Sequence, residues 1–139
     1  MDPKKKNIIA SLITAGIVGY WMYNQFPIID MTDPIQVGQF LLKTIGVSVI
    51  TNIVMVIMLS LLVGIFAGKE EKPVFDERDQ LIELYVMRVI LVIFSIGFVT
   101  TLGLVGWNNL SINMSLVVLY LCMYAANIIG DLLKLYWYR

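Results

Sequence analysis

Four long apolar stretches, separated by short polar segments, divide the chain of 139 residues. The corresponding helices are expected approximately over residues 8–26, 37–67, 81–105 and 114–136. A helix of about 20 apolar residues crosses the roughly 30 Å hydrocarbon core of a membrane. The pattern therefore predicts an all-α integral membrane protein, a four-helix bundle that forms one domain over residues 1–139.

Aromatic and helix-terminating residues mark the ends of the predicted helices. The runs Tyr20-Trp21-Met22-Tyr23 and Tyr136-Trp137-Tyr138-Arg139 are typical of a membrane interface, and Pro27 ends the first helix. Asp76 is a good N-cap, and Asp79 stands three residues later, as in a capping box. The third helix is therefore expected to begin in water, about two turns before its apolar part.

The composition agrees with a membrane protein and excludes several other classes. Hydrophobic residues make up 59% of the chain, charged residues only 14%, and the mean hydropathy is +0.83. A soluble protein of this size cannot bury that much apolar surface. An ordinary soluble enzyme, a nucleic-acid-binding domain and a disordered tail are thereby excluded.

The distribution of basic residues predicts the orientation of the chain. The segments 27–36 and 106–113 contain no Lys or Arg. In a four-span arrangement the other side carries the basic residues Lys4, Lys5, Lys6, Lys69, Lys72, Arg78, Lys134 and Arg139. Cytoplasmic loops carry such an excess. We therefore expect a multi-pass protein of the cytoplasmic (inner) membrane, with the loop 68–80, the N-terminus and the C-terminus in the cytoplasm.

Small residues recur at four-residue spacing in three of the predicted helices, where they let neighbouring backbones approach closely in lipid. These stripes are Ser11, Ala15 and Gly19; Ser60, Gly64 and Gly68; and Cys122, Ala126 and Gly130. They predict a compact bundle or a helix-mediated homo-oligomer, with a dimer favoured. Cys122 is interpreted as a packing residue, because a single cysteine cannot form an internal disulfide.

Polar residues within the apolar stretches are candidates for function, because burying them in a membrane is costly. Asn52 and Asn127 lie deep in the second and fourth stretches, and Lys43 lies near one end of the second. Buried amides commonly bond to a neighbouring helix, and a lysine near a helix end can reach the interface. The alternative interpretation is a polar pathway for an ion or a proton.

Arg88 and Asp131 are expected to form an ion pair inside the membrane. Each lies about two turns from the cytoplasmic end of its helix, and an unpaired charge there would cost several kcal/mol. The pair would fix the register of two adjacent helices, or it would form a gate or a polar site facing the cytoplasm.

The densest charge cluster of the chain is Asp76, Glu77, Arg78 and Asp79. It has three interpretations: a helix cap with a solvated face, a docking site for a protein, or a divalent cation site, which would need oxygen ligands converging from several directions. We expect a partner-binding role for these four residues. With no His in the chain and no base beside a nucleophile, we expect no catalytic residue, cofactor or metal.

The Asp76–Asp79 motif with Ile82 and the ending Lys134–Arg139 resemble a widespread group of small prokaryotic membrane proteins of unknown function. These have four predicted spans, an Asp-Glu-Arg-Asp loop motif and a basic-aromatic C-terminus. The resemblance implies a bacterial or archaeal cytoplasmic membrane and the same topology. Members of the group often accompany small helix-turn-helix regulators, which implies a signalling or sequestering role. The group supplies no catalytic residues.

Three function classes remain from the sequence. The favoured class is a non-enzymatic binding or signalling module, homo-oligomeric, whose cytosolic loop engages a partner such as a small regulatory protein, without direct contact to nucleic acid. The second is a channel or transporter for an ion or small solute, which requires Asn52, Asn127, Arg88 and Asp131 to face one cavity. The third is an accessory subunit of a larger membrane complex.

Overall fold

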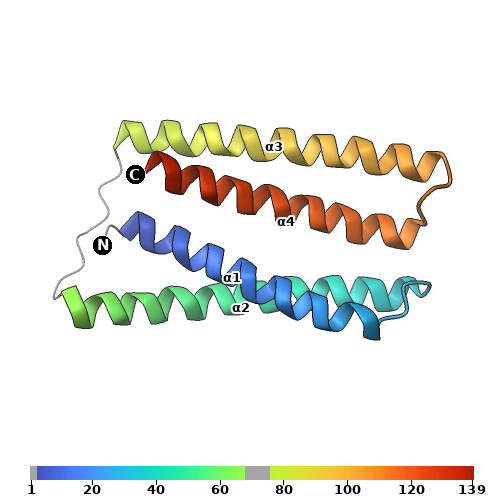
Figure 1. Ribbon diagram of the computed structural model, residues 1–139, viewed down its shortest axis with the longest axis horizontal. Coiled ribbons are helices and arrows are strands. Elements are labelled where there is room, and N and C mark those ends of the chain that lie inside the picture. Colours follow the sequence, from blue (N-terminus) through green and yellow to red (C-terminus); the bar gives the residue numbers. More distant parts are fainter. Residues whose placement is uncertain (1–2, 68–75) are drawn as a thin grey trace.

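The computed structural model describes residues 3–67 and 76–139 and contains four long α-helices in these residues (Figure 1). They are α1 (Pro3–Gln25), α2 (Pro34–Ala67), α3 (Glu77–Gly106) and α4 (Ile112–Trp137), with a short 3₁₀ turn at Phe26–Ile28. No strand occurs in the described residues. The predicted all-α class and the order of four helices are confirmed.

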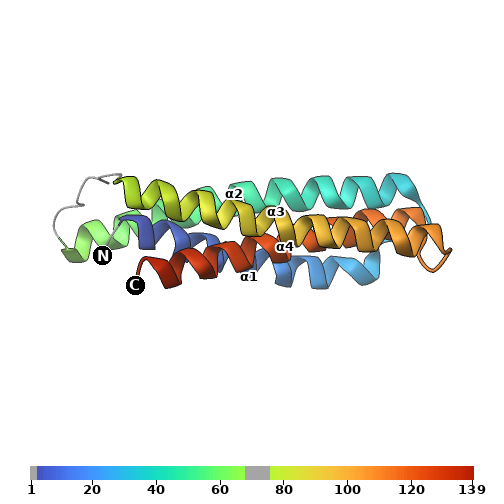
Figure 2. The ribbon, with the colours of Figure 1, turned by 90° about the horizontal axis from the view of Figure 1, so that it is seen from above.

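The helices form two hairpins that lie side by side (Figures 1 and 2). In the first hairpin α1 packs against α2, and in the second α3 packs against α4. The hairpins meet where α4 contacts both α1 and α2. The backbone of α3 packs closely against α4, and the Lys4–Asp79 ion pair joins the start of α3 to α1. Both termini lie at the end where α2 stops and α3 begins, which we call the terminal end (Figure 1). The turns between α1 and α2 and between α3 and α4 lie at the opposite end.

Three of the four helices are long and apolar enough to cross a membrane: α2 over Pro34–Phe66, α3 and α4. Most of their large apolar side chains, such as Leu42, Ile65 and Leu91, are exposed. Soluble monomeric proteins rarely expose apolar surfaces of this extent. These helices therefore suit a membrane protein.

The first helix differs from the expected apolar span over residues 8–26. α1 is not among the helices that are apolar enough to cross a membrane, within the described residues. It begins with three lysines and ends with Tyr23, Asn24 and Gln25. It contributes several of the most buried side chains, among them Ala10, Thr14 and Val18. One face of α1 packs against α2 and α4, whereas its large side chains Ile13, Ile17, Tyr20 and Tyr23 remain exposed.

The start of α3 follows the sequence prediction. The Asp76 carboxylate accepts a hydrogen bond from the backbone N–H of Glu77 at 2.8 Å. The Asp79 carboxylate accepts one from the backbone N–H of Asp76 at 3.0 Å, which completes the capping box. α4 begins at Ile112, two residues earlier than expected, because the side chain of Ser111 caps it by accepting from the N–H of Met114.

The small-residue stripes of α1 and α4 pack within the chain. A Cβ added to Gly97 of α3 would lie 2.7 Å from Cys122 Sγ, and one added to Gly130 of α4 would lie 2.6 Å from Ile90 Cδ1. On α1, the backbone carbonyl of Ala15 accepts a hydrogen bond from the Tyr124 hydroxyl of α4. The predicted compact packing is thus present, and these two stripes are occupied by intrachain contacts rather than open to a second copy.

The stripe of α2 behaves differently from the other two. The Ser60 hydroxyl accepts a hydrogen bond from the buried Lys6 ammonium of α1 at 2.8 Å. A Cβ added to Gly64 would meet nothing within 4 Å. Gly68 and the first part of the predicted loop 68–80 lie outside the described residues.

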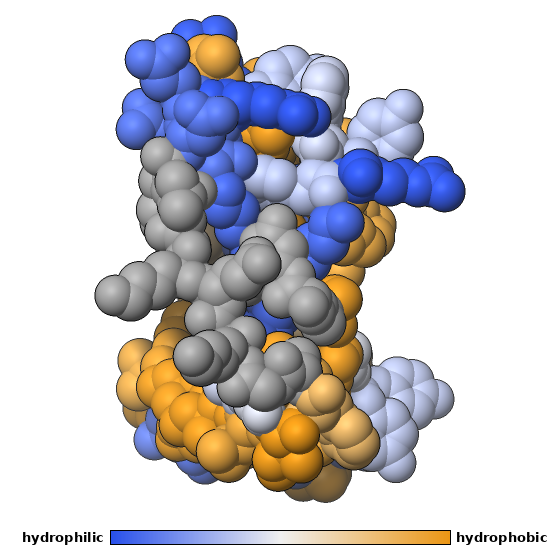
Figure 3. Space-filling model, turned by 90° about the vertical axis from the view of Figure 1, so that its left-hand side faces the viewer, coloured by the Kyte–Doolittle hydropathy of each residue, from blue (hydrophilic) through white to orange (hydrophobic). Residues whose placement is uncertain are grey.

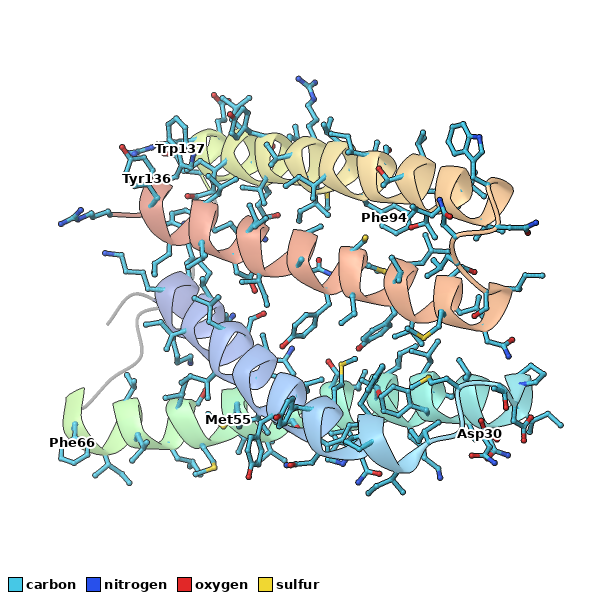
Figure 4. All side chains as sticks on the ribbon, turned by 45° about the vertical axis from the view of Figure 1, so that its right-hand side comes forward. Asp30, Met55, Phe66, Phe94, Tyr136 and Trp137 are labelled. Atoms are coloured by element: carbon cyan, nitrogen blue, oxygen red, sulfur yellow. The ribbon has the colours of Figure 1, made fainter. Side chains whose placement is uncertain are left out.

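A small apolar core and a few polar bonds hold the opposite end together. Trp21 of α1 stacks on Phe40 of α2 with ring centroids 5.9 Å apart. The Asn113 amide of α4 donates hydrogen bonds to the carbonyl oxygens of Met31 (3.2 Å) and Thr32 (2.9 Å). These bonds tie the start of α4 to the connection between α1 and α2, where Asp30 lies (Figure 4).

Candidate functional site

A cavity of about 370 Å³, with a mostly apolar lining that also carries polar side chains from three helices, lies between α1, α2 and α4. Each helix contributes two polar side chains at helical spacing: Ser11 and Thr14 from α1, Ser48 and Asn52 from α2, and Asn127 and Asp131 from α4. Tyr120, Tyr124 and Met123 also line it, together with four smaller or aliphatic residues. The cavity opens to the surroundings, because Asn52 and Asn127 remain exposed.

Three of the four residues predicted to share a cavity are thereby brought together. Asn52, Asn127 and Asp131 all line this one space. Amides and a carboxylate are expensive to place among apolar helices, and residues of this kind mark substrate or ion pathways in membrane proteins. Arg88, the fourth, is not part of the lining.

No ion pair joins Arg88 and Asp131 within residues 3–67 and 76–139, where the structure has the Lys4–Asp79 pair. Gly130 of α4 packs against Val86 and Ile90 of α3. Successive helical residues are rotated by about 100°, so Arg88 lies on the side of α3 away from α4, where it is exposed. The same rotation turns Asp131 away from α3 and toward α1. The matching depths of the two residues were predicted from the sequence, but their helix faces do not meet.

The carboxylate of Asp131 accepts a hydrogen bond from the Ser11 hydroxyl of α1 instead. A second, smaller pocket of about 190 Å³ lies on the terminal side of this contact and shares both residues with the cavity. Its other lining residues include Lys4, Asn7, Glu83, Lys134 and Tyr138. We call it the vestibule. Ser11 and Asp131 thus form a wall that the vestibule and the cavity have in common.

Thr14 presents an unpaired polar atom to the cavity. Its side chain is 4% exposed, and Oγ1 has no hydrogen-bond partner among residues 3–67 and 76–139. Buried hydroxyls in native proteins are nearly always hydrogen-bonded, to protein or to water. A polar occupant of the cavity, either water or a ligand, would satisfy this hydroxyl.

The Asp76–Asp79 motif lies at the terminal end, beside the N-terminus of α1. Figure 3 views this end and shows hydrophilic side chains over the ends of α1, α3 and α4, and hydrophobic ones over the end of α2. Asp79 is buried and forms an ion pair with Lys4. Asp76 and Asp79 are therefore used in capping and pairing, whereas Glu77 and Arg78 are exposed.

The motif does not form a metal site in the described residues, where no three acidic or cysteine side chains converge on one point. Lys43, the remaining polar residue predicted within a span, is exposed on α2. It lies one turn from Gln39 toward the middle of the helix and does not line the cavity. Lys43 is therefore not part of the candidate site. Its exposed side chain can extend along the helix to the membrane–water interface.

The sequence prediction missed Thr14 and gave Ser11 only a packing role. A repeated spacing of polar residues in the sequence would have identified Ser11 and Thr14 as lining residues. Three helices each carry two polar residues three or four positions apart inside an apolar stretch, which places each pair on one helix face. Tyr120 and Tyr124 follow the same spacing on α4, one turn before Asn127 and Asp131.

Comparisons of the chain with protein-family models, with curated proteins and with solved structures found no match. The cavity and its polar lining are therefore the basis for assigning a function.

Proposed function

We propose that this protein is a four-span transporter or channel that accepts a small polar or cationic solute in the cavity between α1, α2 and α4. The convergence of Asn52, Asn127 and Asp131 on one space carries this proposal. The sequence alone favoured a binding module, because it could not tell whether these residues share a face. The second function class required these three residues and Arg88 to face one cavity; the three meet and Arg88 does not, and the meeting of the three supports this class.

In this proposal α1 also crosses the membrane, in addition to α2, α3 and α4, and it packs against α2 and α4. The protein lies in a cytoplasmic membrane with its terminal end in the cytoplasm. Two observations support this orientation: Lys4, Lys5, Arg78 and Lys134 lie toward the terminal end, and the turns at the opposite end contain no Lys or Arg. The vestibule is then the cytoplasmic entrance to the cavity.

Uptake into proteoliposomes tests the proposal. The purified full-length chain would be reconstituted and supplied with radiolabelled Na⁺, Rb⁺, methylammonium or glycerol. We expect uptake of at least one of these solutes above that of protein-free liposomes. The variant with Asn52→Leu and Asn127→Leu should lose it, because two apolar side chains replace the amides of the cavity.

Asn24→Leu with Asn109→Leu is the matched control. These two asparagines are exposed and do not line the cavity, so uptake should be unchanged. A wild-type protein that carries none of the four solutes would contradict the transport function. Equal uptake by the cavity variant would show that any flux bypasses the cavity.

The exposed residues of the acidic motif favour a second candidate, binding of a cytosolic protein. Glu77 and Arg78 are exposed on the first turn of α3 and are not used by the capping box. A double charge reversal, Glu77→Lys with Arg78→Glu, keeps the net charge and the cap. If this surface binds a partner such as a small regulator, the variant should lose that protein in affinity capture from native membranes while retaining its expression level.

A homo-oligomer, if it forms, must use surfaces other than the stripes of α1 and α4. Chemical cross-linking in native membranes would measure the oligomeric state. An added Cβ at Gly64 of α2 would meet no atom of the chain within 4 Å, so this glycine is open to a second copy. A Gly64→Leu variant should disrupt a dimer whose interface includes Gly64 and should preserve a dimer that forms elsewhere.

A further inference from the structure

We propose that the cavity binds a monovalent cation, with Asp131 as its counter-ion and the Ser11–Asp131 hydrogen bond as the closed gate toward the vestibule. This inference deepens the proposed function, on which it rests, by naming the class of solute and the residues that admit it.

The charge of the lining selects a cation. Among the described residues that line the cavity, Asp131 is the one Asp or Glu, and none is a Lys or Arg. Its described hydrogen-bond partner is a neutral hydroxyl, Ser11. A carboxylate removed from water is stabilised by an opposite charge far more than by a hydroxyl alone. A cation in the cavity would supply that charge.

The other polar groups of the cavity complete a suitable site. The hydroxyls of Ser48 and Thr14 and the amide oxygens of Asn52 and Asn127 are all available as oxygen ligands or hydrogen-bond acceptors. Thr14 Oγ1 is buried and lacks a partner in the described chain. A volume of about 370 Å³ holds an ion with several waters or a small organic ammonium.

The position of Ser11 makes its hydrogen bond a gate. Ser11 and Asp131 line both the cavity and the vestibule. A cation that passes between the two spaces must come alongside Asp131 and compete with the Ser11 hydroxyl for the carboxylate. In the vestibule, Lys4 is paired with Asp79, and Glu83 and Lys134 bring opposite charges. This entrance therefore does not present an excess of positive charge to a cation.

Protection of Asp131 from dicyclohexylcarbodiimide tests the inference without measuring flux. This apolar reagent modifies carboxyl groups in apolar surroundings, and mass spectrometry of the full-length protein in nanodiscs would follow the adduct. We expect Na⁺, K⁺ or methylammonium to slow modification of Asp131 about tenfold at roughly ten times the Kd, by mass action. The bulky cation N-methylglucamine at equal ionic strength should not protect. The three protecting salts distinguish an inorganic ion from an organic ammonium.

Two serine variants test the gate. Ser11→Ala removes the hydrogen bond that the cation must displace, so half-protection should need about tenfold less cation, within the range of a charge-assisted hydrogen bond. Ser95→Ala is the matched control, at an exposed serine of α3 that does not line the cavity, and should leave that concentration unchanged. If Ser11→Ala raises the concentration instead, Ser11 is a ligand and the gate is overturned.

Modification of Asp131 that is absent, or equally fast in every salt, overturns the cation site. The experiments distinguish failure of the transport function from failure of the cation site. Protection without uptake in proteoliposomes would remove transport and keep the site, whereas glycerol uptake without protection would keep transport and remove the cation.

Discussion

Gly130 of α4 lies directly against Ile90 of α3, so close that an added Cβ would come within 2.6 Å of Ile90 Cδ1 and 3.2 Å of Val86 Cγ1. In lipid the hydrophobic effect does not drive two helices together, so close van der Waals packing of this kind is what makes them associate. Among the described helices, α3 has its close backbone packing with α4, so this contact has a large share in keeping α3 in the bundle.

Gly130→Leu should therefore destabilise the protein by about 1–3 kcal/mol, the usual cost of overpacking. Thermal unfolding in detergent would measure the loss. Gly64→Leu, at a glycine with open space around it, should leave the midpoint unchanged or raise it, because leucine favours helix more than glycine does. A similar loss in both variants would mean that helix propensity or lipid contact, rather than the α3–α4 contact, is responsible.

Arg88→Leu and Asp131→Leu should have independent effects on stability. The two side chains lie on faces that do not meet, so the double variant should lose the sum of the single losses to within about 0.5 kcal/mol, as for unconnected sites. Unfolding of both single variants and the double variant in the same detergent measures this. A coupling above about 1 kcal/mol would show that the pair forms in the membrane.

Asp76→Ala should loosen the first turn of α3. It removes a side-chain acceptor of the capping box, a change that typically costs about 0.5–2 kcal/mol, and hydrogen exchange at the amides of residues 77–80 should rise. Glu77→Ala, at the adjacent exposed carboxylate, is the control and should leave exchange in this turn nearly unchanged. Unaltered exchange in Asp76→Ala would contradict the capping role.

Asn113→Ala should free the turn between α1 and α2 from the start of α4. It removes two hydrogen bonds to the carbonyl oxygens of Met31 and Thr32, each worth about 0.5–1.5 kcal/mol net. Faster hydrogen exchange over residues 30–35 would report the change. Asn109→Ala, in the neighbouring turn, should not affect these amides; an equal increase there would point to general loosening of that end.

The sequence predicted the helices well because each prediction needed only local information. Apolar length located the four helices, and the spacing of Asp76 and Asp79 located the capping box. The contact between Cys122 and Gly97 was also within reach, since small residues at four-residue spacing indicate a packing face. α1 departed from the pattern because lysines at its start and polar residues at its end lower its apolar content.

The site was harder to predict because it depends on rotation about the helix axis. The depths of Arg88 and Asp131 along their helices follow from counting residues, but a rotation of about 200° between Val86 and Arg88 sends Arg88 away from α4. Asn52 and Asn127 were identified as candidates singly. Their meeting with Thr14 required knowing which faces of α1, α2 and α4 point at one another.

The packing of α3 on α4, together with the Lys4–Asp79 ion pair, also defines how the acidic motif and the cavity can communicate. One face of α4 lines the cavity with Asn127 and Asp131, and another face receives α3 at Cys122 and Gly130. In the described residues, α3 reaches the helices of the cavity through its packing on α4 and through the Lys4–Asp79 ion pair. A protein or lipid that displaced the start of α3 would act on the cavity by tilting or rotating α4 or by breaking that ion pair, and variants of Gly130 and of Lys4 would separate these two effects.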